Sequence, residues 1–135
     1  TDGQKMSKSK ENAIDIFLTD KALRKQIMSI KTDSTPLEAP KDWAVCNCFA
    51  IYELLASKQA LETMKENYQA GGYGYGDAKQ ALFELICKKF SFERERYNHY
   101  MAHPEEVEKI LTLGAGKAAA VANSVLARVR KKLGY

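Results

Sequence analysis

The chain has 135 residues, of which 45% are hydrophobic and 28% are charged, and its formal net charge is +4. This length favours one domain, and the apolar fraction is too high for a disordered chain. No uninterrupted apolar run approaches the roughly 18 residues that span a bilayer, so we expect no transmembrane segment and no membrane partner. Three cysteines cannot all pair, which predicts reduced thiols and a cytoplasmic protein.

The charge is unevenly distributed along the chain. Residues 1–31 carry seven basic and four acidic side chains, residues 32–116 carry nine and thirteen, and residues 117–135 carry five and none. Positive ends can bind the phosphates of a nucleotide or of a nucleic acid. The C-terminal cations can equally be residues of a last helical turn, where the helix dipole favours them. Both interpretations of the C-terminal charge stay open at this point.

The first third of the chain predicts a loop, a short extended segment and one helix. Residues 1–12 are polar and rich in lysine, and residues 13–18 are mostly apolar with β-branched side chains. Asp20 is a suitable N-cap, and apolar residues follow it at helical spacing until about Lys31. Residues 32–40 contain two prolines and several turn-forming residues, which predicts a connection without regular structure.

The middle of the chain predicts three further helices. Asp42 can cap the first of them, and Ser57 either breaks or re-caps the chain. The next helix is expected to end at the glycines that open the loop Gly71–Gly76, because glycine commonly follows the last helical residue. Asp77 is then expected to cap a long helix that reaches Met101.

The last helix is predicted to begin at the sequence His103-Pro104, because proline is favoured at the first helical position. Gly114 and Gly116 lie inside this helix, and each disfavours it by about 1 kcal/mol relative to alanine, so a kink or break is expected there. Along the whole sequence, we predict about five helices and no convincing sheet. We therefore predict an all-α helical bundle with a flexible N-terminal arm.

The clearest chemical motif is the sequence Lys5-Met6-Ser7-Lys8-Ser9 in the opening loop. Two lysines three residues apart in a loop can face one polyphosphate, and the serines and loop amides add donors for its oxygens. Ammonium groups placed there can stabilise the charge that develops when an α-phosphate is attacked and pyrophosphate leaves. A solvated, lysine-rich tether is the alternative that the residues alone leave open.

These five residues match the KMSKS signature of class I aminoacyl-tRNA synthetases. Further segments resemble the bacterial tryptophanyl-tRNA synthetases over essentially the whole chain: Asn12-Ala13-Ile14, Phe17-Leu18-Thr19-Asp20, Thr32-Asp33-Ser34, Cys46-Asn47, and the run from Tyr68 to Lys79. The Gly-Tyr-Gly loop and the Thr-Asp-Ser turn favour the tryptophanyl enzymes over the tyrosyl ones. There are local departures, such as Cys48 in place of a more usual apolar residue.

The resemblance implies that the chain is the C-terminal third of such an enzyme, which agrees with the absence of an initiator methionine. Residues 1–19 then form the KMSKS loop and the link from a catalytic nucleotide-binding domain, and residues 20–135 form a helical anticodon-binding domain. Lys5 and Lys8 are implied as catalytic residues at the phosphates of ATP, which is bound with Mg²⁺, and Met6, Ser7 and Ser9 complete the ATP-binding loop. The resemblance also implies that the chain is inactive alone.

The implied partners are tRNA(Trp), ATP, tryptophan and a second subunit in a homodimer. The candidate tRNA-binding residues are basic side chains in the predicted helices and at their ends: Lys79, Arg94, Arg96, Arg128, Arg130 and Lys131. The alternative hypothesis is a free-standing, non-catalytic helical module that binds RNA or protein. An upstream nucleotide-binding domain would favour the enzyme, and a start codon near Thr1 would favour the module.

The remaining constellations predict no metal site. Cys46 and Cys48 lie about 200° apart around a helix and therefore do not converge on one ion. His99 and His103 share a helix face, but the sequence places no third ligand beside them. Tyr73 and Tyr75 can either stack on unpaired bases or pack against the bundle, and packing is the favoured interpretation because it buries the rings.

Overall fold

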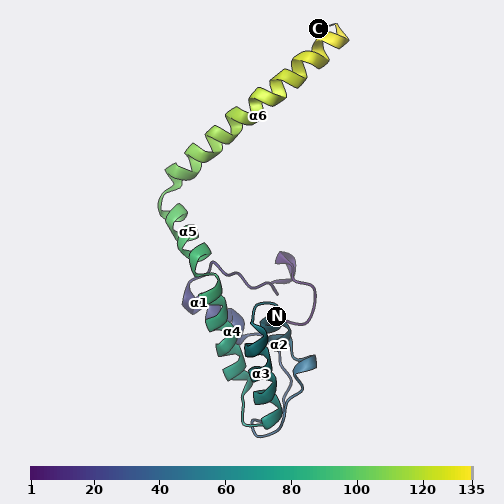
Figure 1. The fold of residues 1–135 in the computed structure, drawn as a ribbon, viewed down its shortest axis with the longest axis vertical. Coiled ribbons are helices and arrows are strands. Elements are labelled where there is room, and N and C mark those ends of the chain that lie inside the picture. Colours follow the sequence, from purple (N-terminus) through teal and green to yellow (C-terminus); the bar gives the residue numbers. More distant parts are fainter. Residues whose placement is uncertain (135) are drawn as a thin grey trace. The chain divides into compact units, whose positions relative to one another are not determined.

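The computed structural model describes residues 1–134, except for the side chain of Lys8. Within this part of the chain every regular element is helical, which confirms the all-α prediction (Figure 1). The elements are the 3-10 helices η1 (Lys8–Lys10) and η2 (Trp43–Val45), and the α-helices α1 (Asp20–Met28), α2 (Asn47–Glu53), α3 (Lys58–Ala70), α4 (Tyr75–Lys89), α5 (Ser91–Ala102) and α6 (Pro104–Leu133).

The chain divides into two compact units, residues 1–94 and the remainder from Glu95 onward. The first unit contains the hydrophobic core, in which α4 packs against α1 and α2. Its largest fully buried side chains come from α1 to α4 and from the short segment after α1: Leu23, Ile27, Ile30, Cys48, Phe49, Tyr68, Leu82 and Ile86. The predicted boundary at residue 19 lies inside this unit and stays a prediction about a longer protein.

The entry into α1 differs from the prediction. Residues 13–18 contain a turn and no strand, because no neighbouring strand is present in the described chain to pair with them. Thr19 is the N-cap of α1, and Asp20 is its first residue. The carboxylate of Asp20 still lies in the first turn, where the helix dipole favours it, and it forms an ion pair with Arg94.

Two predicted cap residues do cap helices, but only Ser57 caps the expected one. The carboxylate of Asp42 accepts a hydrogen bond from the backbone nitrogen of Ala44 at 2.9 Å, although it caps η2, and α2 begins only at Asn47. The hydroxyl of Ser57 accepts from the backbone nitrogen of Ala60 at 3.3 Å and caps α3. Short polar side chains at these positions therefore begin the helices as their type predicts.

Gly71 ends α3 as predicted, and the structure shows why no other residue fits. Its φ angle is +74°, and a Cβ atom there would lie 2.4 Å from the backbone oxygen of Glu38. The left-handed backbone and this close approach both require the absence of a side chain. The loop of residues 32–40 consequently lies directly against the end of α3.

Lys41 is a buried cation that holds the same loop. The residue is only 4% exposed. Its Nζ donates to the backbone oxygens of Pro36, Leu37 and Ala39 at 3.0, 3.1 and 3.2 Å. Its backbone nitrogen donates to the oxygen of Tyr68 at 2.8 Å. Three carbonyl partners satisfy the three donors of the ammonium group, which makes its burial tolerable.

The start of α4 corrects a second predicted cap. Gly74, and not Asp77, is the N-cap, and α4 begins at Tyr75. Asp77 is the third helical residue, and its carboxylate accepts from the backbone nitrogen of Gly74 at 3.0 Å. An acidic residue at this position supports the helix start from inside the helix. The predicted long helix is also divided, because α4 ends at Lys89 and Phe90 separates it from α5.

The predicted restart at Pro104 is confirmed, with His103 as the N-cap of α6. The predicted kink is wrong, because α6 continues through Gly114 and Gly116. The residues between and after these glycines include several alanines, which are the strongest helix formers and offset the glycine penalty. Gly134 adopts the left-handed conformation that commonly ends a helix.

The length and composition of α6 also correct the expectation that no segment is long and apolar enough to span a membrane. The helix has 30 residues, and an 18-residue window in it has a mean hydropathy of 1.4, which is long and apolar enough to cross a membrane by these two criteria alone. No part of that window is buried within the structure. The same helix carries Lys117 and the basic cluster near its C-terminal end.

Candidate functional site

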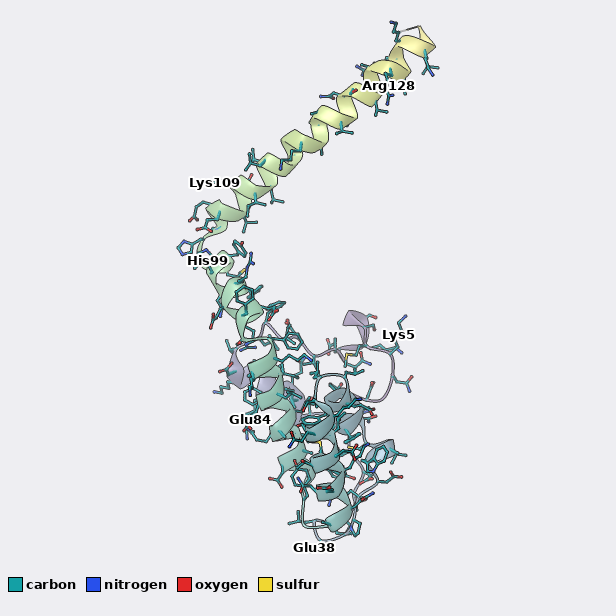
Figure 2. The ribbon with its side chains drawn as sticks, viewed as in Figure 1. Lys5, Glu38, Glu84, His99, Lys109 and Arg128 are labelled. Carbon is teal, nitrogen blue, oxygen red and sulfur yellow. The ribbon has the colours of Figure 1, made fainter. Side chains whose placement is uncertain are left out.

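The lysine-containing motif lies in a loop that ends in the short helix η1. Residues Lys8–Lys10 form η1, and the backbone nitrogen of Lys10 donates to the oxygen of Ser7 at 3.2 Å. Glu11 follows with a φ angle of +52°, which reverses the chain direction. Figure 2 shows the side chain of Lys5 extending outward from this loop, and the residue is exposed. The side chain of Lys8 lies outside the described part of the structure.

The donors in this loop suit an anion. The hydroxyls of Ser7 and Ser9 lie 3.2 Å apart, and Ser9 is exposed. One of these hydroxyls donates to the other, so the pair offers one further neutral donor beside the charged ammonium group of Lys5 within one short segment. Such groups match the oxygens of a phosphate chain, which accept hydrogen bonds and carry negative charge. The predicted phosphate-binding chemistry is therefore compatible with the exposed groups.

Asp2 is the acidic residue closest in the chain to the motif's N-terminal end, and it is engaged in hydrogen bonds. Its Oδ1 accepts from the side-chain amide of Asn12 at 2.9 Å and from the backbone nitrogen of Gln4 at 3.1 Å. These two bonds, the first above all, hold the pKa of Asp2 below its usual value. Asp2 thus stays ionised and acts as an acceptor inside the loop structure.

Asn12 is buried directly beneath the motif. Its Oδ1 accepts from the backbone nitrogen of Ser7 at 2.9 Å, and its Nδ2 donates to Asp2 and to the backbone oxygen of Lys5 at 2.9 and 3.3 Å. The residue is only 2% exposed. One amide group therefore contacts the chain at three places: before the motif at Asp2, at its first residue Lys5, and at its central residue Ser7.

Asn47, at the start of α2, connects this loop to the helical core. Its Nδ2 donates to the backbone oxygen of Lys31 at 3.0 Å, and the backbone nitrogen of Lys31 donates to the oxygen of Thr1 at 2.9 Å. Gly3 approaches the same side chain so closely that a Cβ atom would lie 2.9 Å from Oδ1 of Asn47. Gly3 also has a φ angle of +79°, so this contact depends on glycine.

The Gly-Tyr-Gly loop packs against the core, which agrees with the favoured interpretation of its tyrosines. The ring centroids of Tyr73 and Tyr75 lie 5.8 and 6.1 Å from that of Tyr68 in α3. The hydroxyl of Tyr75 donates to Oδ1 of Asp33 at 2.7 Å, and burial together with this bond raises the pKa of Tyr75 to about 12. The same bond is the main cause that lowers the pKa of Asp33.

Replacing Tyr75 with phenylalanine is expected to raise the pKa of Asp33 toward its ordinary value of 3.8, because the neutral hydroxyl stabilises the carboxylate. In the wild-type protein, Asp33 favours the folded state above the unfolded pKa, and this contribution is lost as the pH falls through the lower, folded pKa. A carbon-detected NMR titration of the carboxyl group measures the change. Tyr73→Phe is the matched control, and an unaltered Asp33 pKa in Tyr75→Phe contradicts the assignment.

Two of the six candidate tRNA-binding residues lie in the first unit, and their side chains bond to other elements of that unit. Lys79 donates from Nζ to the backbone oxygen of Met28 at 3.1 Å, and Arg94 donates to the backbone oxygen of Ile16 and to Asp20. Both side chains therefore tie α4 and the start of α5 to the segment around α1. Contact with RNA at these positions stays a prediction.

The other four candidates belong to the second unit. Arg96 bonds the hydroxyl of Tyr100 at 2.9 Å, one turn further along α5. Arg128, Arg130 and Lys131 are exposed in the last turns of α6, where the helix dipole favours cations. Both of the interpretations drawn from the sequence, an RNA-binding surface and a charged helix end, fit this placement.

The junction of α5 and α6 gathers more titratable groups than the sequence placed there. Nε2 of His99 lies 2.9 Å from Oε2 of Glu106, and Nδ1 of His103 lies 3.3 Å from Oε1 of Glu105. The ligand atoms of His103, Glu105 and Glu106 lie within 4.8 Å of one another. These side chains are exposed or half-buried and lie in close histidine–carboxylate pairs, so their arrangement has an explanation without an ion.

The three cysteines are free thiols, and Cys46 and Cys48 are buried. Burial raises the pKa of the Cys48 thiol to about 12, so it remains protonated and unreactive near neutral pH. The sulfur of Cys46 lies 3.4 Å from the hydroxyl of Tyr68 inside the core. This environment is that of small structural side chains, as the sequence predicted.

Sequence reasoning assigned no role to Asn12, Lys41 or Asn47, although all three hold loops in place. Apart from the carboxylate of Asp2, which Asn12 contacts, their partners are backbone atoms, which leave no residue-type signal in a sequence. For Asn12 the only signal was its position: an amide between the lysine-rich loop and the apolar residues that follow it.

The chain spans about two fifths of the length of the curated relatives that it matches. It is 44% identical to tryptophan–tRNA ligase of Campylobacter jejuni over 99% of the chain and 42% of that protein, and 43% identical to the ligase of Rhodopirellula baltica with the same coverage. The crystal structure of tryptophanyl-tRNA synthetase from Campylobacter jejuni matches with a TM-score of 0.96, covering 100% of this chain and 44% of that one.

A second crystal structure of the Campylobacter jejuni enzyme, complexed with ADP and tryptophan, matches with a TM-score of 0.95 at 43% identity. It covers 99% of this chain and 42% of that one. The family described as tRNA synthetases class I (W and Y) matches residues 1–91, which include the whole KMSKS loop. The chain therefore belongs to the class I tRNA synthetases of the tryptophan and tyrosine group, and its relatives within that group are bacterial tryptophan–tRNA ligases.

Proposed function

We propose that this chain is the C-terminal, KMSKS-bearing part of a tryptophan–tRNA ligase. The intact protein converts tryptophan and ATP into tryptophanyl-adenylate and pyrophosphate. It then transfers the tryptophan to tRNA(Trp). The observation that carries this proposal is the similarity to tryptophan–tRNA ligases along essentially the whole chain, combined with an exposed lysine in a loop that carries the class signature. The cytoplasm is the compartment in which such a protein acts.

The proposed role of the loop is electrostatic. In the first step, a carboxylate oxygen of tryptophan attacks the α-phosphorus of ATP, and the bond to the bridging oxygen of the leaving pyrophosphate breaks. Negative charge then grows on the phosphate oxygens. The ammonium groups of Lys5 and Lys8 stabilise this charge, and the hydroxyls of Ser7 and Ser9 add hydrogen bonds to the same oxygens.

The loop fits the phosphates of ATP better than it fits a resident metal ion. The exposed polar side chains described within the motif, Lys5 and Ser9, can both donate, and the carboxylate of Asp2 is already bonded to Asn12 and Gln4. We therefore propose that Mg²⁺ arrives with ATP and is held mainly by the phosphate oxygens, as is usual for this ion. No Mg²⁺ ligand is assigned to the described residues.

The chain spans 42% of the length of its relatives, and we propose that the tryptophan pocket and the rest of the ATP site lie outside it. The 135-residue chain alone is then expected to catalyse no tryptophan-dependent exchange of pyrophosphate with ATP. We also propose that the intact protein is a homodimer, which light scattering during gel filtration measures.

The helical part is proposed to hold the anticodon stem-loop of tRNA(Trp). Among the six basic candidates, Arg128, Arg130 and Lys131 are the strongest, because they are exposed together at one end of α6. Lys79 and Arg94 already bind carbonyl or carboxylate oxygens of the chain and are weaker candidates. Arg96 remains a candidate beside Tyr100.

Removal of the three cations near the end of α6, as Arg128→Ala, Arg130→Ala and Lys131→Ala together, is expected to weaken tRNA binding by the intact protein. The slope of log affinity against log salt concentration should become shallower by roughly 1 for each lost phosphate contact. Binding titrations at several salt concentrations measure both quantities. Lys88→Ala, at an exposed lysine of α4, is the control. An unchanged affinity and slope in the triple variant assigns these residues to the helix end alone.

The experiment that tests the proposed function is a charging assay with the intact protein. Labelled tryptophan, ATP and Mg²⁺ are supplied with purified tRNA(Trp) or tRNA(Tyr). Charging of tRNA(Trp) alone is the expected result. If the protein is folded and neither tRNA is charged, the proposal is overturned.

A further inference from the structure

Asn12 is the polar side chain that is most completely buried next to the KMSKS motif, and its three hydrogen bonds are directed at the loop. The residue is 2% exposed, although it directly follows the lysine-rich loop and the exposed Glu11. Burial of an amide is unfavourable unless its donors and acceptor are satisfied. Here Oδ1 has Ser7, and Nδ2 has Asp2 and Lys5.

The three partners of Asn12 fix the path of the motif. The bond to the oxygen of Lys5 (3.3 Å) and the bond to the nitrogen of Ser7 (2.9 Å) hold the backbone on either side of Met6. The bond to Asp2 (2.9 Å) ties the same amide to the chain before the motif. A segment held at residues 2, 5 and 7 has far fewer accessible directions for the Lys5 side chain than an unrestrained loop has.

Only a short side chain with both an acceptor and a donor group can make these contacts. The amide of asparagine supplies one oxygen and two N–H groups. Aspartate has nearly the same shape, but it lacks the donors and places a second negative charge beside Asp2. Alanine removes all three bonds. The chemistry of the position therefore specifies asparagine.

We infer that Asn12 is a positioning residue of the phosphate-contacting loop: it holds the backbone of Lys5 and Ser7 so that the lysine ammonium group meets the reacting phosphates. This inference rests on the proposed function of the loop. Groups that orient a reacting site are worth about 10- to 100-fold in activity when removed, although they touch no substrate. Asn12 acts through Lys5 and is not itself a catalytic residue.

The test uses the intact protein and measures kcat and KM for ATP in tryptophan-dependent pyrophosphate exchange, with the dissociation constant of tryptophan measured separately. Asn12→Ala is expected to lower kcat by about 10- to 100-fold while the tryptophan constant changes less than twofold. Asn67→Ala, at an exposed asparagine of α3, is the matched control and should keep the wild-type values.

A pair of variants separates positioning from general damage to the fold. Asn12→Asp should lower kcat, because the new carboxylate faces that of Asp2. Adding Asp2→Asn reverses the donor and acceptor roles across this 2.9 Å contact and is expected to restore at least part of the lost kcat, at least fivefold. The rescue assigns the loss to this one contact, and equal midpoints of thermal unfolding in the variants and the wild type separate a loss of positioning from a destabilised fold.

A readout without activity completes the design. Trypsin cleaves after exposed lysines in mobile segments, so Asn12→Ala should speed cleavage within residues 5–10 by at least tenfold, with the midpoint of thermal unfolding measured alongside. If the wild-type protein catalyses no pyrophosphate exchange, the proposed function is overturned. The trypsin result then decides only whether Asn12 holds the loop. Active wild-type protein with equal kcat and equal cleavage in Asn12→Ala overturns the inference.

Discussion

Replacing Lys8 with alanine in the intact protein is expected to slow formation of tryptophanyl-adenylate by on the order of 100- to 1,000-fold, the usual effect of removing one group that stabilises developing negative charge. The affinity for tryptophan should stay the same, because the lysine is proposed to contact phosphate and not the amino acid. Single-turnover kinetics with labelled ATP measure the first quantity, and equilibrium binding measures the second.

Lys10→Ala is the matched control for this prediction. Lys10 is exposed and lies in the same short helix η1, but it lies outside the five-residue motif. It should lower the rate by less than threefold, through the general loss of one positive charge from the loop. Equal effects of the two substitutions would mean that the loop contributes only net charge, and no effect of either would remove the loop from the reaction.

The second large effect is expected in the core. Leu82 of α4 is 0% exposed and packs in the cluster that α1 to α4 share, so Leu82→Ala leaves a cavity. Such substitutions lower the free energy of unfolding by about 3 kcal/mol. Urea unfolding of the 135-residue chain measures the change. Trp43, the single tryptophan, is the probe, because its ring centroid lies 5.3 Å from that of Phe49.

Leu54→Ala provides the control for the core substitution, because the Leu54 residue is 79% exposed at the end of α2. The same chemical change there should alter the free energy of unfolding by less than about 0.5 kcal/mol. If both variants lost similar stability, the burial of Leu82 would not be the cause, and the packing of α4 in the core would be contradicted.

Helices that carry a local start signal were predicted well from the sequence. Ser57 and Pro104 begin α3 and α6 at the expected places, because the cap and the first turn involve only neighbouring residues. Asp77 was misplaced by three residues. Its carboxylate does support the start of α4, but from the third helical position, and both arrangements bring an acid to the same end of the helix.

Errors were larger where a weak local preference competes with its surroundings. Gly114 and Gly116 predicted a kink, whereas α6 remains continuous because the strong helix formers around them outweigh two glycine penalties. The apolar character of α6 was also underestimated, because Lys117 and the glycines interrupt its hydrophobic residues along the sequence but do not prevent a long, apolar helix.

The candidate site divides in the same way. Lys5 and its serine neighbours were predicted from the motif, since residue type and spacing carry the chemistry. The contacts of Asn12 depend on how the loop folds over a residue five to ten positions away, and its partners include two backbone atoms. A sequence shows which groups can bind phosphate, but it does not show which side chain fixes the path of the loop that presents them.

We propose that this chain belongs to an enzyme that activates tryptophan through its KMSKS loop. Pyrophosphate exchange by the intact protein, measured with each of the twenty amino acids in turn, tests it most directly. We expect exchange with tryptophan and at least 100-fold less with tyrosine, and loss of that exchange in Lys8→Ala. Exchange that prefers tyrosine, or exchange with tryptophan that persists unchanged in Lys8→Ala, would contradict it.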